Sequence, residues 1–480
     1  MTRATTLLLG TTILAGLGVG CATVPKDAGF ADVQTTVHQR TGFVPDWVLN
    51  PDQEKAVKTR TRALLEHDLG VEEVVELALL NNHRVQATFE ELGLARSDLL
   101  QARLPRNPML GIDIRSPEQA FELSLMQSLI SLLQIPRRRA VAAANFESTK
   151  WRVAHEVLGL VAGVRIAYYS LQAAEQVEAM RRTVTETART SAELAIRQRD
   201  AGNLPDLGLE NEQAFLEQAK LQLASSEAVT LSARENLNRV MGLWGEETNW
   251  KIAPALSEIP TGDPGLEGLE SQAVAQRLDL QAAWQEIQAA ARAVPLARRS
   301  ANGAIELGVH REREPEGITT TGPVLDYTVP VFDQGKPAKS RAEALLRQSK
   351  DRYAALAVEI RSDIREAWNR LVLARSRVEY YRDVVLPRRS RIVELSQRNY
   401  NFMLLGPYQL ILAKQNEINA QSESIQAQKD YWIARTELER AIGGSLPATD
   451  GGTGSPQPGE PTKENIQAPE PHHDTHGDEP

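Results

Sequence analysis

The chain has 480 residues, a formal net charge of −9 and 24% charged residues of both signs. A protein that binds phosphate backbones usually carries a basic stripe, so nucleic acid is not expected as a partner. Aromatic residues make up only 5% of the chain, and this favours long helices with small interface residues over an aromatic-rich core. The single cysteine, Cys21, excludes an intramolecular disulfide.

The first twenty residues have the pattern of a secretory signal peptide. Arg3 precedes an apolar run over residues 7–17, and small residues lead to Cys21. This lone cysteine resembles the lipidated cysteine of a bacterial lipobox. Acyl chains such as palmitate on Cys21 would give stable anchoring, at about 0.8 kcal/mol per buried methylene. Ala22 follows in place of a retention aspartate, so the outer membrane is the expected destination. The alternative is an ordinary signal peptide with an incidental cysteine.

A long internal repeat dominates the rest of the chain. The segment that begins at Leu77 matches the segment that begins at Gln272 without a gap, and the segments from Val164 and Ile364 also match. The unit is about 200 residues long, far above solenoid repeats of roughly 20–50. The pattern therefore indicates duplication of a whole domain, with the order helix, two strands, and a long helical segment broken once.

Each unit is predicted to begin with one helix, which spans residues 71–103 in the first unit. Strands are predicted at residues 109–115 and 121–126, and at 305–310 and 325–331, because apolar and polar residues alternate there. One interpretation is a soluble antiparallel sheet, and the strands alone favour it because they carry few aromatic residues for a membrane-interface belt. The secretory signal and the long helices favour a membrane barrel instead. No later uninterrupted apolar run reaches the length of about 20 residues that a spanning helix needs.

Very long helices are predicted after the strands. Pro136 and Pro337 introduce helical segments, and about 65 residues at 1.5 Å each would extend about 100 Å. Pro387 predicts a kink or break in the second of these segments.

The domain boundaries follow from these patterns. We expect a signal peptide at 1–20, a lipidated N-terminal segment at 21–70, repeat 1 at 71–245, a linker at 246–268, repeat 2 at 269–443 and a disordered tail at 444–480. The tail contains clustered histidines, and two interpretations stay open: a solvated tail, or a loose site for Cu or Zn. The weak metal candidates are His472, His473 and His476.

These features together resemble the TolC-like outer-membrane efflux factors. The segment "GPVLDYTVPVFDQGKPAKSRAEA" resembles the family's strand and P-x-F-D-x-G turn in the second repeat. The segment "YNFMLLGPYQLILAKQ" resembles the second-repeat tip of the subgroup linked to heavy-metal efflux. The likeness covers about residues 71–443.

The resemblance implies a mostly helical homotrimer. Each chain would supply four strands to a twelve-stranded barrel in the outer membrane, continued by a long α-helical barrel through the periplasm. The partners implied are a periplasmic adaptor and an inner-membrane pump, and the chain itself would be a passive duct without a cofactor. Charged residues on the polar strand faces would line the lumen, namely Asp113, Glu122, Glu306, His310 and Asp326.

Two turns interrupt the long helical segments, and the resemblance places both at the periplasmic mouth. One interpretation is that these residues only form the turns, with Asp206 as the N-cap of the resumed helix. The functional interpretation is adaptor docking and pore closure. "RQRDAGNLPDL" matches "SQRNYNFMLLGPYQL" with a small length difference. Asp206, Glu210 and Glu212 are candidates for charge at the closed entrance. The tip residues are Gly202, Asn203, Leu204, Pro205, Asp206, Met403, Leu404, Leu405, Gly406 and Pro407.

Enzymatic motifs are lacking in the sequence: it contains no G-x-S-x-G, P-loop, H-E-x-x-H or C-x-x-C pattern. The expected function is an efflux duct for heavy-metal ions or drugs. The alternative is a non-conducting periplasmic coiled-coil lipoprotein with a structural or adhesion role.

Overall fold

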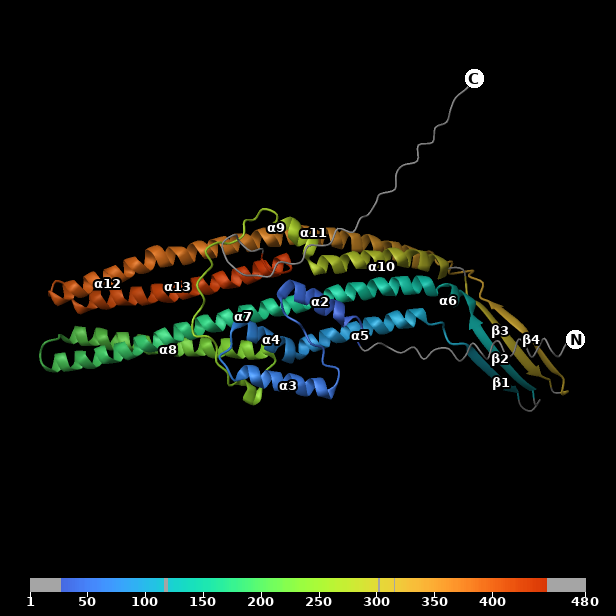
Figure 1. Cartoon of the computed structure of the whole chain (residues 1–480), viewed down its shortest axis with the longest axis horizontal. Coiled ribbons are helices and arrows are strands. Elements are labelled where there is room, and N and C mark those ends of the chain that lie inside the picture. The colour runs from blue at the N-terminus through green and yellow to red at the C-terminus, as the bar shows by residue number, and fades with distance from the viewer. Residues whose placement is uncertain (1–26, 116–119, 301–302, 315, 447–480) are drawn as a thin grey trace, which may run out of the picture.

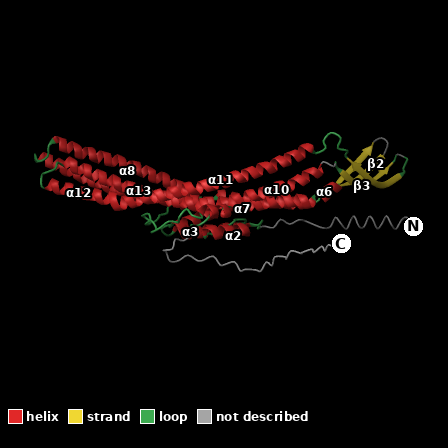
Figure 2. Cartoon of the chain, turned by 90° about the horizontal axis from the view of Figure 1, so that it is seen from above, coloured by secondary structure: helices red, strands yellow, loops and turns green. Residues whose placement is uncertain are grey.

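The molecule is a long helical bundle that carries a small sheet at one end. The computed structural model describes residues 27–115, 120–300, 303–314 and 316–446. The signal peptide, Cys21 and the tail histidines therefore lie outside the described residues. The sheet occupies one end of the molecule and two helical turns occupy the other (Figure 1). The long helices run side by side between these ends and curve gently (Figure 2).

Two helices, two strands and a long helical hairpin follow one another twice along the chain. The first set comprises α4 (Val71–Asn81), α5 (His83–Arg103), β1 (Met109–Arg115), β2 (Ala120–Ser128), α6 (Leu129–Leu133), α7 (Ile135–Asp200) and α8 (Asp206–Met241). The second set comprises α9 (Leu269–Gln276), α10 (Leu278–Ser300), β3 (Ile305–Arg313), β4 (Thr319–Tyr327), α11 (Lys336–Tyr380), η3 (Tyr381–Val385), α12 (Leu386–Asn401) and α13 (Pro407–Ile442). A short 3₁₀ turn, η2 (Gly245–Thr248), begins the connection between them.

The predicted first helix is in fact two helices in each set. Asn82, with ψ of 104°, separates α4 from α5, and Arg277, with ψ of 127°, separates α9 from α10. These two residues correspond in the repeat register. The C-terminal cap of the last helix of each set packs against each break. A Cβ on Gly242 would lie 2.5 Å from the Asn81 carbonyl oxygen, and one on Gly443 would lie 3.4 Å from Arg277 Cα.

The long helices have the predicted length. The 66 residues of α7 are continuous, and they extend about 100 Å at 1.5 Å per residue. In the second set, the π-helical turn η3 joins α11 to α12, with Pro387 in the first turn of α12. Proline lacks the N–H that an α-helix needs, so the predicted distortion takes the form of a π-turn within a continuous helical path.

The π-turn also explains the small length difference between the two units. Ala167 and Leu171 are buried like Ala367 and Leu371, an offset of 200 residues, whereas the two tips correspond with an offset of 201. A π-turn accommodates one inserted residue without rotating the flanking helix. The prediction placed this difference at the tips, but the connections there have equal length.

The four strands form one antiparallel sheet in the order β1-β2-β3-β4. Strands β2 and β3 pair with each other, so the sheet joins the two sets of elements. Strand β4 spans Thr319–Tyr327, not residues 325–331 as predicted. The ladder ends at the pair formed by Ile305, the first residue of β3, and Tyr327. Val329 and Val331 lie in the connection to α11.

The N-terminal segment contains two helices that the sequence pattern did not predict. Helix α2 (Phe30–Thr41) packs on α7, and α3 (Pro51–Leu65) packs on α4. Phe30 lies edge-on to Phe89 of α5, with ring centroids 4.9 Å apart. Trp47 donates a hydrogen bond to Glu90 at 3.1 Å. This segment is therefore fastened to the middle of the bundle.

The interior contains a larger apolar cluster around α4, α5 and α7, a second around α11 and α13, and a small third cluster of Ala173, Leu256 and Ile425. Within the described residues, one helix, α7, has a stretch long and apolar enough to cross a membrane, but 61% of that stretch is buried inside the structure. Most of the apolar surface of α7 in this stretch is thus packed inside the bundle.

Candidate functional site

One face of the sheet gathers the charged side chains of all four strands. The register places Asp113 opposite Glu122, His310 opposite Ser124 and Glu306 opposite Asp326. Directly opposed residues in antiparallel strands point to the same side. The five side chains predicted to share a polar face therefore do so, although the lumen assignment itself is a proposal.

Arg115 organises the acids nearest the strand tips on this polar face. Its guanidinium lies 3.2 Å from Glu122, 3.6 Å from Asp113 and 4.0 Å from Glu312. His310 lies 3.5 Å from the same Glu312. The sequence prediction missed Glu312 because the predicted strand ended at His310, whereas β3 continues to Arg313.

Glu306 and Asp326 form the other acidic pair on the polar face, at the end of the sheet nearer the helices. They are cross-strand neighbours, and neither has an ion-pair partner among the described residues. Like charges directly opposed across strands repel each other. The pair therefore adds negative potential to this face without contributing to sheet stability.

The opposite face of the sheet is apolar and open. Nine of its side chains are between 37% and 72% exposed: Leu110, Ile112, Ile114, Phe121, Leu125, Leu307, Val309, Leu325 and Tyr327. A contiguous exposed patch of this kind usually marks contact with a membrane or a protein. Arg311 and Arg313 interrupt the face near the far end of β3, opposite Leu123 and Phe121.

The two helical turns share one backbone geometry. After α7, Gly202 has φ of +75°, and the Asn203 N–H donates to the Gln198 carbonyl at 2.8 Å. After α12, Met403 has φ of +56°, and the Leu404 N–H donates to the Asn399 carbonyl at 2.9 Å. Both are Schellman motifs, in which a left-handed residue ends the helix.

The side chains of the two tips differ. Met403 is 94% exposed, Leu404 74% and Phe402 69%, whereas Leu405 is half-buried. At the first tip, Arg199 donates to the Asp206 carboxylate at 3.0 Å. The predicted capping role of Asp206 is wrong, because Pro205 occupies the N-cap position and Asp206 is the first helical residue. Its charge is still favourable in the first turn.

Only part of the predicted acidic entrance cluster faces outward. Glu212 is 9% exposed and accepts a hydrogen bond from Ser191 of α7 at 2.8 Å. This carboxylate therefore ties α8 to α7. Asp206 and Glu210 are exposed near the tip.

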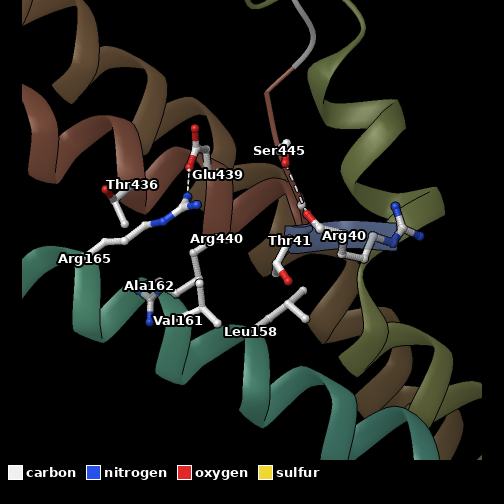
Figure 3. Close-up of a pocket in the computed structure, with 11 residues that line it drawn as sticks. Arg40, Thr41, Leu158, Val161, Ala162, Arg165, Thr436, Glu439, Arg440 and Ser445 are labelled. Atoms are coloured by element: carbon white, nitrogen blue, oxygen red, sulfur yellow. Dashed lines mark hydrogen bonds and ion pairs between the residues drawn. The ribbon is translucent and has the colours of Figure 1, made fainter. Parts of the chain in front are cut away.

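The two halves of the bundle meet where α7 packs against α13. Arg165 of α7 lies 2.8 Å from Glu439 of α13 beside a cavity of about 30 Å³ (Figure 3). Burial raises the pKa of the Glu439 carboxyl, even though Arg165 and Arg435 lie close to it. Nearby, the rings of Tyr169 and Trp432 stack with centroids 5.3 Å apart. An ion pair and an aromatic pair thus join the halves.

The part of the chain that the structure describes contains no group of three or more His, Cys, Asp or Glu side chains arranged to hold a metal ion. The weak candidates His472, His473 and His476 lie in the tail beyond it.

Comparison with known proteins identifies relatives of this architecture. No family model matches the chain. A cobalt-zinc-cadmium resistance protein, CzcC, of Cupriavidus metallidurans is 22% identical over 334 residues, which is 66% of this chain and 77% of the relative.

Two solved structures superpose on most of the chain. The Campylobacter jejuni CmeC outer-membrane channel superposes with a TM-score of 0.68 and 17% identity, covering 84% of this chain and 90% of that one. The transmembrane channel protein CusC superposes with a TM-score of 0.65 and 14% identity, covering 79% of this chain and 93% of that one. With its four-stranded sheet and paired long helices, the chain has the fold of the TolC-like outer-membrane channels.

Proposed function

We propose that the chain is the outer-membrane component of a tripartite efflux system and acts as a passive exit duct through the outer membrane of a Gram-negative bacterium. The observation that carries this proposal is the sheet, whose apolar face is exposed and whose opposite face is charged. A membrane barrel needs that division between lipid and lumen.

The sheet has two unpaired edges, β1 and β4, and open edges are not tolerated in lipid. Three copies that pair β4 of one chain with β1 of the next would close a twelve-stranded barrel. Such head-to-tail contacts form a ring when the rotation closes. Asp113, Glu122, Glu306, His310 and Asp326 would then line the lumen.

The helices would continue the duct into the periplasm, where an adaptor and an inner-membrane pump supply specificity and energy. The tips are the proposed docking and gating sites, since their exposed apolar residues lie at the end of the molecule opposite the sheet. No catalytic step is assigned to the chain. An acylated Cys21, at the start of the expected N-terminal segment 21–70, would anchor the chain in the membrane.

We propose divalent metal ions as the substrate class. The similarity to a cobalt-zinc-cadmium resistance protein supports this, and an acidic lumen would favour cations. Growth of a deletion strain on cobalt, zinc, cadmium, copper and drugs tests the assignment. If the deletion strain kept its metal tolerance and lost its drug tolerance, the substrates would be drugs and not metal ions.

Single-channel conductance of the purified protein in a planar bilayer, together with its mass in detergent, tests the duct itself. The proposal expects a trimer that conducts ions without an added energy source. A non-conducting monomer would instead support the alternative of a periplasmic coiled-coil structural or adhesion lipoprotein.

A further inference from the structure

An exposed apolar segment lies between the sheet and the long helices, outside the strands. In the connection from β4 to α11, Phe332 is 100% exposed, Val331 64% and Val329 63%. At the corresponding junction of the first set, α6 exposes Leu133 at 72%. Isolated exposed apolar residues are normal, but these lie together in the junctions between the strands and the long helices, at the base of the sheet.

The segment is held in a defined shape. The Thr328 N–H donates to the Ala304 carbonyl and the Val331 N–H to the Val329 carbonyl, both at 2.9 Å. Gly303, with φ of +75°, sits so close that a Cβ there would meet the Thr328 carbonyl. Pro330 has no N–H to satisfy. Two of the four backbone N–H groups in residues 328–332 are thus paired within the structure.

The strands alone are too short for the hydrophobic layer. On β4, the apolar face runs from Thr321, which lies opposite Arg311, to Tyr327. The six steps between these seven residues rise about 20 Å. A tilt of 35–45° leaves about 15 Å of height, against an apolar band of about 25 Å in outer-membrane barrels. Arg311 and Arg313 limit the apolar face at the far end of β3, while Ile114 and Phe121 carry it to that level on β1 and β2. On the β3–β4 side, further apolar height is available at the base. Residues 328–332 reach up to about 16 Å.

Cations surround this base. The helix ends that face the sheet carry exposed basic side chains, and none of them has an ion-pair partner within the described residues. Positive charge beside apolar side chains is typical of the boundary between lipid and water, where it meets anionic headgroups. The cations are Arg103, Arg106, Arg139, Arg298, Arg299 and Lys336.

We propose that residues 329–332 and α6 form an apolar collar that lies within the periplasmic leaflet of the outer membrane, with the surrounding cations at anionic phospholipid headgroups. This inference rests on the proposed function, because it requires the sheet to span the membrane. The collar supplies the lower part of the hydrophobic belt that the strands lack.

Spin labels on single cysteines test the collar. The sites are Phe332→Cys in the collar, Ile112→Cys on the apolar strand face and Phe402→Cys at the helical tip, each in the full chain reconstituted in vesicles of phosphatidylethanolamine and phosphatidylglycerol. The unsubstituted chain gives the background from Cys21. Collisions with oxygen report lipid, and collisions with a water-soluble nickel chelate report solvent.

The inference expects oxygen to dominate at positions 112 and 332 and the nickel chelate to dominate at position 402. Lipid at 112 with water at 332 would overturn the collar and leave the duct intact. Low access of both reagents to 332 would place this side chain against a neighbouring copy and would also overturn the collar. Water at both 112 and 332 would remove the proposed membrane barrel itself.

Discussion

Met403 occupies a backbone conformation that its counterpart Gly202 adopts without strain. A left-handed conformation costs an L-residue with a side chain roughly 1–2 kcal/mol, and such strain tends to persist where function requires the side chain. Met403 is also 94% exposed, so packing does not explain its presence. The strain and the exposure together support contact with a partner at the second tip.

Substitution of matched leucines at the two tips tests this asymmetry. Leu404 is 74% exposed at the second tip and Leu207 is 73% exposed beside the first. Leu404→Asp is expected to lower efflux at least about tenfold, which corresponds to about 1.4 kcal/mol of lost docking free energy, with the trimer intact. Leu207→Asp should lower it less. Resistance assays with detergent mass as the folding check measure both, and equal effects would contradict the asymmetry.

Protonation of the Glu439 carboxyl, which lies between the two halves of the bundle, should make the free energy of unfolding depend on pH. Because its folded pKa is raised, the folded state holds this proton more tightly than the unfolded state does. Stability is therefore lost as pH rises through the folded pKa and regained as pH falls toward the usual value of about 4.5. Glu439→Gln should remove this component of the pH dependence. Denaturant unfolding at pH 5 and pH 7 measures it, and identical pH dependence in parent and variant would contradict the prediction.

At the scale of elements, the two long helical segments differ by the π-turn. If η3 accommodates one inserted residue, deletion of one residue there should convert the π-turn into regular α-helix. Helix α12 would then stay in register with α13. Deletion of Val384 combined with Pro387→Ala is expected to change the free energy of unfolding by no more than about 1 kcal/mol.

The control is deletion of Val184, the corresponding residue in α7, which has no π-turn to absorb the loss. The deletion would rotate the following helix by about 100°. Ala188, Ala192 and Ala195 would leave the interface with α8, at a cost of about 3 kcal/mol or more. Thermal unfolding of both variants measures the difference, and similar destabilisation would refute the inserted-residue explanation.

At the scale of the whole molecule, the charges on the polar face of the sheet determine the expected conduction. In a closed trimer, Glu306 and Asp326 would place six carboxylates near the inner end of the barrel. Glu306→Gln combined with Asp326→Asn should lower the cation-over-anion permeability ratio several-fold, because the negative potential of the lumen falls. Reversal potentials in a salt gradient measure the ratio. Glu54→Gln on the peripheral α3 is the control, and it should leave the ratio unchanged.

Periodicity predicted the first three strands and the long helices well because both patterns are local, but it placed β4 about five residues too far along the chain. Alternation in residues 109–115 matches β1, and the absence of proline between Pro136 and Pro205 matches the continuous α7. The end of β4 was missed because apolar alternation continues through Val329 and Val331 after the ladder stops. The bends at Asn82 and Arg277 were missed, although the Asn82 side chain caps α5 locally by accepting from the Arg84 N–H. The caps of α8 and α13 that pack against these bends come from the other end of each unit.

The sequence by itself determined the duplication, the polar and apolar faces of the strands and the place of the two turns, since each depends on residues near one another in the chain. The tertiary structure alone decided that β2 pairs with β3, that Glu439 lies buried beside Arg165 and that Met403 shares the backbone geometry of Gly202. These features arise from contacts between residues more than about 180 positions apart, or from backbone conformations that packing imposes, and local residue preferences do not encode them.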